Sequence, residues 1–433
     1  MKTTVRIRDF DAVMAMKRPK HRLPIKPLSI LRGVIRIAAI PDLLFSGFTY
    51  EMHRMEEVGD EPCLILMNHS CFMDLEIAYR IFFPKPLNIV CTSDGFVGKE
   101  WLMRLIGCIP TQKFVTDVRL IQDMTHALKK LKSNVLLYPE ASYSFDGTAT
   151  PLPRKMGVLL KKLDVPVVMV RTEGAFSRNP LYNCLQKRKK VKVHAHVECL
   201  FTREELKTKT VQELSDRLDE AFTFDGFQQQ YDKGLVIDEP FRADGLERVL
   251  YKCPACGAEG KTEGKGTGLT CHACGKHYEL TPLGKMEASE GITEFPHIPD
   301  WFNWEREQVK QELLEDTYRL DTEVDIAMMV NFNAIYKVGS GRLTHDRSGF
   351  TLTGCDGRLS YTQTPQSCYG LYSDYYWYEL GDIVCIGNND RLYYCFPKDG
   401  TPVAKTRLAA EELYKLYKSR TLRPAPTAPA YAE

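Results

Sequence analysis

The sequence has no uninterrupted apolar run of the roughly 18 residues that a membrane-spanning helix requires. The best candidate, VIRIAAIPDLLFSGFTY at residues 34–50, contains Arg36 and Asp42 and is interrupted by Pro41. The opening residues, MKTTVRIRDFDAV, also lack the apolar segment of a secretory signal peptide. We therefore expect no spanning helix in this segment, and we expect a reducing compartment.

The sequence also has little net charge, +2 over 433 residues, so we expect no nucleic-acid partner. The first fifty residues differ, because ten Lys or Arg against three Asp give +7. Residues 1–50 are therefore predicted to form a basic, amphipathic segment that lies on an anionic membrane surface. The alternative is a packed N-terminal helix behind a solvated basic lead-in. The basic residues before the apolar stretch are Lys17, Arg18, Lys20, Arg22 and Lys26.

Cysteine, by contrast, is plentiful, with fourteen residues, and four of them form two C-x-x-C pairs. Each pair is followed directly by glycine, at Gly257 and Gly275. Paired knuckles of this kind hold Zn²⁺ with tetrahedral geometry, and they resemble a zinc ribbon, here at residues 246–285. Four thiolates leave no open coordination position, so we expect a structural zinc; a redox pair is the alternative. The predicted ligands are Cys253, Cys256, Cys271 and Cys274.

Residues 51–245 alternate between strand-like and helix-like segments, which predicts an α/β domain with a mostly parallel sheet. The expected strands are 63–67, 87–91, 134–138, 165–171 and 191–200. The expected helices are 71–80, 99–106, 118–131, 155–163 and 211–222. Catalytic groups of such sheets gather in the loops at the carboxyl ends of the strands.

The second half of the chain has a different pattern. Residues 286–320 are predicted to be a helical linker, and 321–420 contain short β runs separated by Gly, Asn and Asp turns. With a final helix at 408–418, this antiparallel β domain resembles a pleckstrin-homology-like (PH-like) fold. Residues 421–433, with the sequence LRPAPTAPAYAE from 422, are disordered by composition.

The clearest chemical signal is His69, which follows the buried run Leu64–Met67 and precedes Asp74 by five residues. It is the only one of the ten histidines with Asp at that spacing. On an ideal helix, five residues turn through about 500°, which would hold the two side chains ~140° apart. They can meet only if His69 precedes the helix and folds back toward Asp74. The carboxylate could then orient a histidine that removes a proton from a hydroxyl.

Three further blocks follow in order: GCIPTQK at 107–113, YPEASYS at 138–144 and VPVVMVRTEG at 165–174. Together with NHSCFMD at 68–74, they resemble the glycerolipid acyltransferases of the lysophosphatidic acid acyltransferase type, in which an N-H-x4-D block precedes similar blocks. The resemblance covers about residues 30–220. The sequence departs from the family pattern at Ala141, which stands in place of glycine, and at Tyr143, in place of arginine.

The resemblance implies transfer of a fatty acyl group from acyl-CoA or acyl-ACP to a lysophospholipid, most directly 1-acyl-sn-glycerol-3-phosphate, in bacterial phospholipid biosynthesis. His69 is then the general base and Asp74 its orienting partner. The resemblance also implies that the protein is peripheral and lies on the cytoplasmic face of the cell membrane. The alternatives are another lipid acceptor, or a zinc-ribbon adaptor with an inactive acyltransferase domain. The substrate-binding residues implied are Asn68, Gly107, Lys113, Glu140, Ser142 and Arg171.

Overall fold

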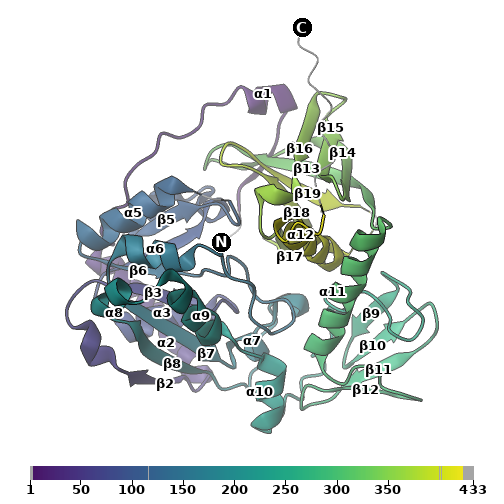
Figure 1. Ribbon diagram of the computed structural model, residues 1–433, viewed down its shortest axis with the longest axis horizontal. Coiled ribbons are helices and arrows are strands. Elements are labelled where there is room, and N and C mark those ends of the chain that lie inside the picture. The colour runs from purple at the N-terminus through teal and green to yellow at the C-terminus, as the bar shows by residue number, and fades with distance from the viewer. Residues whose placement is uncertain (1–2, 116, 399, 401, 423–433) are drawn as a thin grey trace. The chain divides into compact units, whose positions relative to one another are not determined.

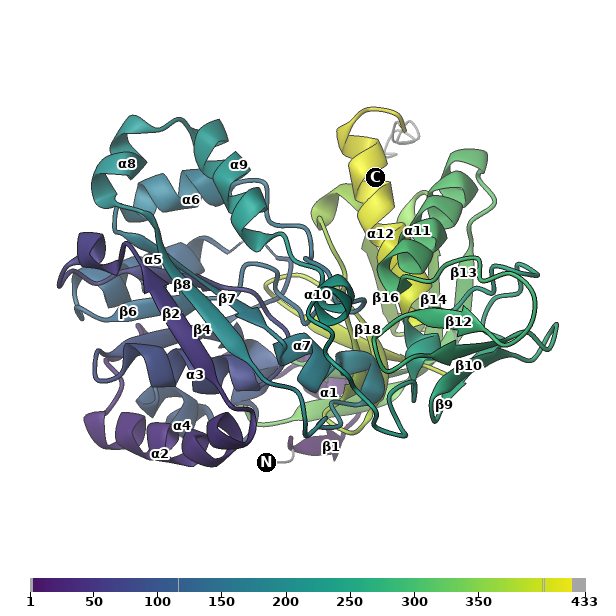
Figure 2. The same ribbon diagram turned by 90° about the horizontal axis from the view of Figure 1, so that it is seen from below.

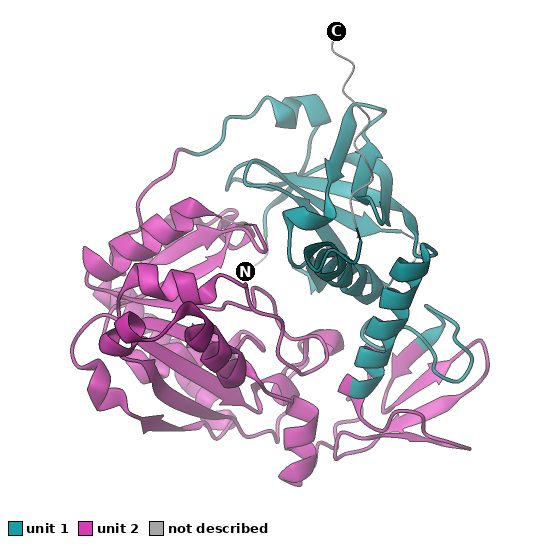
Figure 3. Cartoon of the chain, viewed as in Figure 1, with its two compact units in different colours: residues 1–19, 247–262, 300–433 teal, residues 20–246, 263–299 magenta. Residues whose placement is uncertain are grey.

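The structure is a computed structural model that describes residues 3–115, 117–398, 400 and 402–422 (Figure 1). The chain divides into two compact units, each discontinuous in sequence (Figure 3). Unit 1 comprises residues 1–19, 247–262 and 300–433, and unit 2 comprises residues 20–246 and 263–299. Most of the predicted tail at 421–433 lies outside the described residues.

Unit 2 is built on a seven-stranded mixed sheet with the strand order β2-β8-β7-β3-β6-β4-β5. Figure 2 shows β2 and β8 side by side in this sheet. Neighbouring strands run parallel except β7 and β8, so the α/β prediction with a mostly parallel sheet is confirmed. The central strands β3 and β6 are buried along their whole length, as their unbroken apolar sequences predict. The strands are β2 (Thr49–His53), β3 (Leu64–Met67), β4 (Leu87–Thr92), β5 (Cys108–Thr111), β6 (Asn134–Leu137), β7 (Val167–Glu173) and β8 (His194–Phe201).

Helices cover this sheet. Apolar side chains of α5, α6 and α9 share one buried core with the strands. All five predicted helices of the domain are present, with ends displaced by up to two residues. The longer helices are α2 (Ser29–Phe45), α3 (Met73–Phe82), α5 (Val118–Lys129), α6 (Met156–Leu163) and α9 (Val211–Phe222), and the shorter ones include α4 (Glu100–Leu105), α7 (Ala175–Arg178), α8 (Arg203–Thr208) and α10 (Gly226–Asp232).

One expectation about α2 is wrong. Pro41 does not interrupt the apolar segment, because the helix continues through it to Phe45. Proline removes one backbone hydrogen bond from a helix interior. Ala39 and Leu43, on either side of it, are buried, and their packing holds the helix together there. Among the described residues, no helix has both the length and the apolar character needed to span a membrane.

The cysteine-rich module contains a four-stranded sheet with the order β12-β11-β10-β9. Strand β12 lies at the start of the predicted helical linker, so the prediction of a helix at these residues is wrong. The strand forms there because Met286 is fully buried in the sheet. The helix of the linker is α11 (Ile298–Glu315). The strands are β9 (Thr262–Lys265), β10 (Gly268–Cys271), β11 (His277–Leu280) and β12 (Met286–Ala288).

The β-rich part of unit 1 is an eight-stranded sheet with the order β16-β15-β14-β13-β19-β18-β17. Its consecutive pairs are antiparallel, and β1 (Val5–Ile7) adds to β14 in parallel. Helix α12 begins five residues earlier than predicted, at Val403. The PH-like identity stays a prediction. The remaining elements are α1 (Phe10–Met14), β13 (Leu320–Met329), β14 (Ile335–Asp346), β15 (Gly349–Gly354), β16 (Leu359–Gln363), β17 (Tyr372–Trp377), β18 (Gly381–Gly387), β19 (Leu392–Pro397) and α12 (Val403–Lys418).

Candidate active site

His69 and Asp74 lie in contact at the carboxyl end of β3. The chain leaves the strand at Met67, turns, and enters α3 at Met73, so Asp74 occupies the first turn of the helix. His69 Nδ1 is 3.1 Å from Asp74 Oδ2. The same carboxylate oxygen accepts backbone N–H groups from Ser70 at 2.7 Å and Cys71 at 3.1 Å. The turn therefore folds the histidine back onto the aspartate, as the spacing predicts.

This contact defines the state of the imidazole. Asp74 carries no proton to give when ionised, so Nδ1 is the protonated nitrogen and Nε2 is left as the acceptor. Burial lowers the pKa of His69 below its ordinary value; Asp74 acts in the opposite direction, and the charge of Lys113 lowers the pKa further. The side chain of His69 is still 21% exposed to solvent. His69 is thus a neutral, partly accessible base at neutral pH.

Two tyrosines of the YPEASYS block lie against the imidazole, a contact that the sequence analysis does not predict. The ring of Tyr138 stacks on His69 with centroids 3.9 Å apart, and the ring of Tyr143 lies tilted at 4.4 Å. Their signal in the sequence is only that Tyr138 ends a buried strand, where side chains reach the same sheet edge as His69. They restrict the ring and exclude water from its faces.

Glu140 holds the His69 turn through the backbone. Its side chain is fully buried, Oε2 accepts the N–H of His69 at 2.8 Å, and Oε1 accepts the N–H of Thr150 at 2.7 Å. The Ser144 N–H in turn donates to the His69 carbonyl at 3.1 Å. Both Glu140 oxygens therefore have a structural task, and this residue positions the base.

Asn68 has a similar task on the other side of β3. Its amide oxygen accepts the Thr172 N–H at 2.8 Å, and its amide nitrogen donates to the Thr172 carbonyl at 3.3 Å. The side chain is fully buried and ties the end of β3 to the end of β7. Ser142, on the Glu140 loop, is also buried.

The remaining predicted site residues are dispersed. Lys113 follows β5 at the carboxyl edge of the sheet, the edge of His69. Gly107 precedes β5 at the opposite edge, where a Cβ would come within 3.0 Å of Pro27; the structure does not bring it to His69. Arg171 lies in β7 opposite His196 of β8, and its Nε has no hydrogen-bond partner among the described residues.

The influence of Lys113 on His69 gives a pH prediction. Only neutral His69 can act as base, so activity is lost as pH falls through its lowered pKa. Lys113→Ala removes a cation that lowers this pKa, so the acidic limb of the kcat/KM profile should move to higher pH. Lys85→Ala, which changes a lysine beyond the amino edge of β4, is the matched control and should leave the limb in place. An unmoved limb in Lys113→Ala would contradict the assignment.

Ala141 has a backbone conformation that favours glycine. Its φ is +59°, the left-handed region, and its N–H donates to the Tyr138 carbonyl at 3.1 Å. For a residue with a Cβ this conformation costs about 1–2 kcal/mol. The turn around Glu140 therefore keeps a shape suited to glycine, and the substitution has its cost in stability.

We expect Ala141→Gly to stabilise the protein. Relief of the left-handed strain exceeds the entropy that glycine adds to the unfolded chain, so the free energy of unfolding should rise by about 0.5–1 kcal/mol. Denaturant titration measures this change. Ala127→Gly, in α5, should do the opposite and destabilise by about 1 kcal/mol or more. A loss of stability in Ala141→Gly would show that the turn is not strained.

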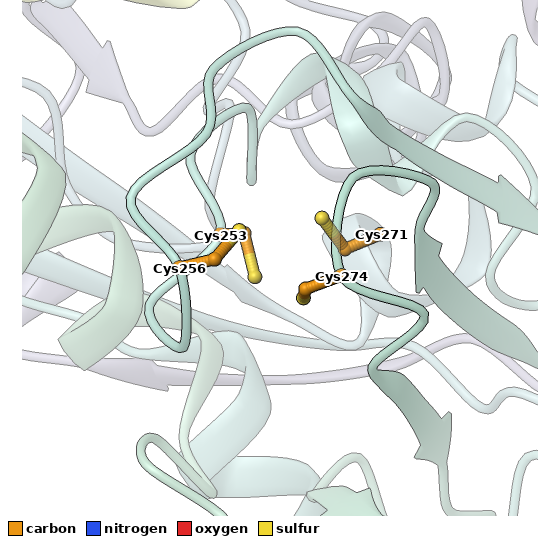
Figure 4. Close-up of side chains that lie close together, drawn as sticks. All are labelled: Cys253, Cys256, Cys271 and Cys274. Carbon is orange, nitrogen blue, oxygen red and sulfur yellow. The ribbon is translucent and has the colours of Figure 1, made fainter.

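The four predicted zinc ligands also come together (Figure 4). Their sulfur atoms all lie within 4.8 Å of one another, and tetrahedral zinc–thiolate geometry requires about 3.8 Å. The two knuckles have the same backbone geometry. Gly257 and Gly275 have φ of +75° and +77°, and the N–H of each donates to the backbone carbonyl of the first cysteine of its pair at 2.8 Å. The residues fit a four-thiolate zinc site with no position left for a substrate.

Comparison with known proteins finds a family model that matches the segment around His69. Residues 49–172 match the family model described as Acyltransferase, a segment that holds His69, Asp74 and Glu140. This part of the chain is thus similar to acyltransferase domains. One solved structure that resembles the chain is the 1-acyl-sn-glycerophosphate (LPA) acyltransferase PlsC from Thermotoga maritima, with 16% identity and a TM-score of 0.35, covering 44% of this chain and 76% of that chain. No curated protein matches the sequence.

Proposed function

We propose that this protein transfers a fatty acyl group from acyl-CoA or acyl-ACP to the hydroxyl of a lysophospholipid, with 1-acyl-sn-glycerol-3-phosphate as the first candidate. The observation that carries the proposal is the contact of 3.1 Å between His69 Nδ1 and the buried Asp74 carboxylate within the acyltransferase segment. It leaves Nε2 as a base, and the lowered pKa of His69 keeps that base unprotonated at neutral pH.

The reaction needs no covalent intermediate on the protein. Nε2 of His69 takes the proton of the acceptor hydroxyl while the hydroxyl oxygen attacks the thioester carbonyl. The tetrahedral intermediate collapses with cleavage of the C–S bond. The imidazolium returns the proton to the departing thiolate, and Asp74 stabilises the imidazolium in between. The products are an ester and a free thiol.

A donor and acceptor panel tests the proposal. Purified protein is incubated with palmitoyl-CoA or palmitoyl-ACP and with 1-acyl-sn-glycerol-3-phosphate or other lysolipids, and the acylated lipid is quantified by mass spectrometry. We expect a diacyl product that depends on both donor and acceptor. Thiol release at the same rate without any acceptor would indicate hydrolysis. No turnover with any pair would overturn the proposal and favour the adaptor alternative.

We also propose that α2 attaches the protein to the membrane. The helix carries apolar side chains that are 55–79% exposed at positions 30, 34, 37, 44 and 45. This spacing follows one helical stripe, while Ala39 and Leu43 are buried on the other face. Lys20, Arg22 and Lys26, just before the helix, are exposed and suit an anionic lipid surface. The exposed residues of the stripe are Ile30, Val34, Ile37, Leu44 and Phe45.

Vesicle sedimentation should therefore detect this stripe. Ile37→Glu with Phe45→Glu removes two exposed apolar side chains and adds two negative charges, so binding to anionic vesicles should fall about tenfold or more. Val118→Glu changes another exposed apolar residue, on α5, and should bind like the unchanged protein. Equal loss in both variants would indicate general charge repulsion, and no loss would exclude α2 as the attachment.

A further inference from the structure

A second group of metal-type side chains lies in unit 2, outside the His69 site and the four cysteines. Glu51 of β2 and His194 and His196 of β8 each offer a ligand atom, and these atoms lie within 4.8 Å of one another. β2 is the edge strand of the seven-stranded sheet and is exposed along its whole length. The group therefore lies at a solvent-accessible margin of the domain.

Strand geometry produces this arrangement. His194 and His196 are two residues apart in β8, so both side chains project from the same face of the sheet. β2 runs parallel to β8 with Glu51 paired to His196, which brings the carboxylate to the same face. The two imidazole rings have centroids 4.7 Å apart. Two imidazoles and one carboxylate on rigid neighbouring strands are a typical ligand set for zinc and similar divalent ions.

Neighbouring contacts engage some ligand atoms of this set, so a cation would compete with them. The Thr49 hydroxyl lies 2.8 Å from His194 Nδ1, which fixes that ring and leaves its Nε2 for a metal. Glu51 Oε1 already lies 2.5 Å from His196 Nδ1 and 3.2 Å from His53 Nε2, and the Glu51 side chain is 48% exposed. Glu173, 3.2 Å from His196 Nε2, is instead engaged by Lys233. Glu51 is thus the carboxylate that a cation would use.

We propose that Glu51, His194 and His196 form a binding site for a borderline divalent cation of the zinc class, with water completing its coordination. Such a site joins the exposed edge strand β2 to β8 and should stabilise the edge that leads from α2 into the sheet. It is independent of acyl transfer. The competing interpretation is a cluster of polar contacts, in which His196 lies between the carboxylates of Glu51 and Glu173 and no metal binds.

Metal stoichiometry distinguishes the two. The full chain is equilibrated with about 10 μM free Zn²⁺ near neutral pH, separated from unbound ion, and analysed for zinc per chain. We expect His194→Ala to hold one equivalent fewer than the unchanged protein, whatever the four-cysteine group retains. His126→Ala, a histidine on α5 outside the cluster, is the matched control and should hold the same amount as the unchanged protein.

A second variant and a second readout keep the test informative even if His194→Ala misfolds. Glu51→Gln changes an exposed residue and should weaken this zinc site about tenfold or more. Saturating zinc should raise the Tm of the unchanged protein by about 5 °C more than that of either variant. Equal zinc content in the unchanged protein and in both variants overturns the proposal and leaves the cluster of polar contacts. Loss of zinc in His126→Ala as well overturns it too, because binding would then be nonspecific.

Discussion

Replacement of His69 by alanine should lower kcat/KM for acyl transfer by about 10²–10⁴-fold, the usual contribution of a general base. The loss follows because His69 Nε2 alone accepts the proton of the acceptor in the proposed reaction. The fold should survive, since the imidazole makes one side-chain hydrogen bond, to Asp74, and the His69 turn is held by backbone contacts to Glu140 and Ser144. Steady-state release of thiol and thermal unfolding of the same preparation measure the two effects.

Cys71→Ala is the control for this prediction, because Cys71 is the nearest candidate for a covalent nucleophile. Its thiol is buried, and burial raises its pKa well above the ordinary value, so little thiolate forms. Activity should therefore stay within a few-fold of that of the unchanged protein. Activity lost in Cys71→Ala but kept in His69→Ala would contradict the direct transfer and indicate an acyl-cysteine intermediate.

The strands that could be predicted from the sequence are those whose residues are buried. β3 and β6 are apolar throughout because both faces are covered, and such runs are easily recognised. Every residue of β2 is exposed, so packing against a core does not require apolar side chains in this strand. β5 contains Pro110, which is tolerated because β5 is the other edge of the sheet. The edge strands were therefore missed for a physical reason.

The contact between His69 and Asp74 was predictable from the sequence, but the partners of Glu140 and Asn68 were not. The His69–Asp74 contact is local, so the five-residue spacing together with the predicted strand–turn–helix order could predict it. The family resemblance implies substrate-binding roles for Glu140 and Asn68, yet their partners are backbone groups of residues such as His69 and Thr172, which the sheet brings near. A single sequence does not encode such pairings in any local pattern. Both residues position the base, and their substrate role stays a prediction.

Removal of zinc from the four-cysteine group should unfold the cysteine-rich module and leave the seven-stranded sheet intact. The module is too small to be held by its own core, in which Leu269, Tyr278 and Met286 are among the few fully buried side chains. Structural zinc contributes about 10–16 kcal/mol in comparable small modules. Amide exchange in β10 and β11 should accelerate at least a hundredfold after chelation, and β3 and β6 should stay protected.

Cys271→Ser tests the same point without a chelator, which would also strip the proposed Glu51 site. It removes one ligand from the buried side of the group and should produce the same local loss of protection with one equivalent of zinc lost. Cys184→Ser, outside the group, is the control and should change neither quantity. If Cys271→Ser kept its zinc and its protection, the paired knuckles would not hold a structural metal, and the redox alternative would explain the C-x-x-C pairs instead. If the protection of β3 and β6 fell as well, the module would stabilise the domain that contains His69, which would account for its presence in the same chain.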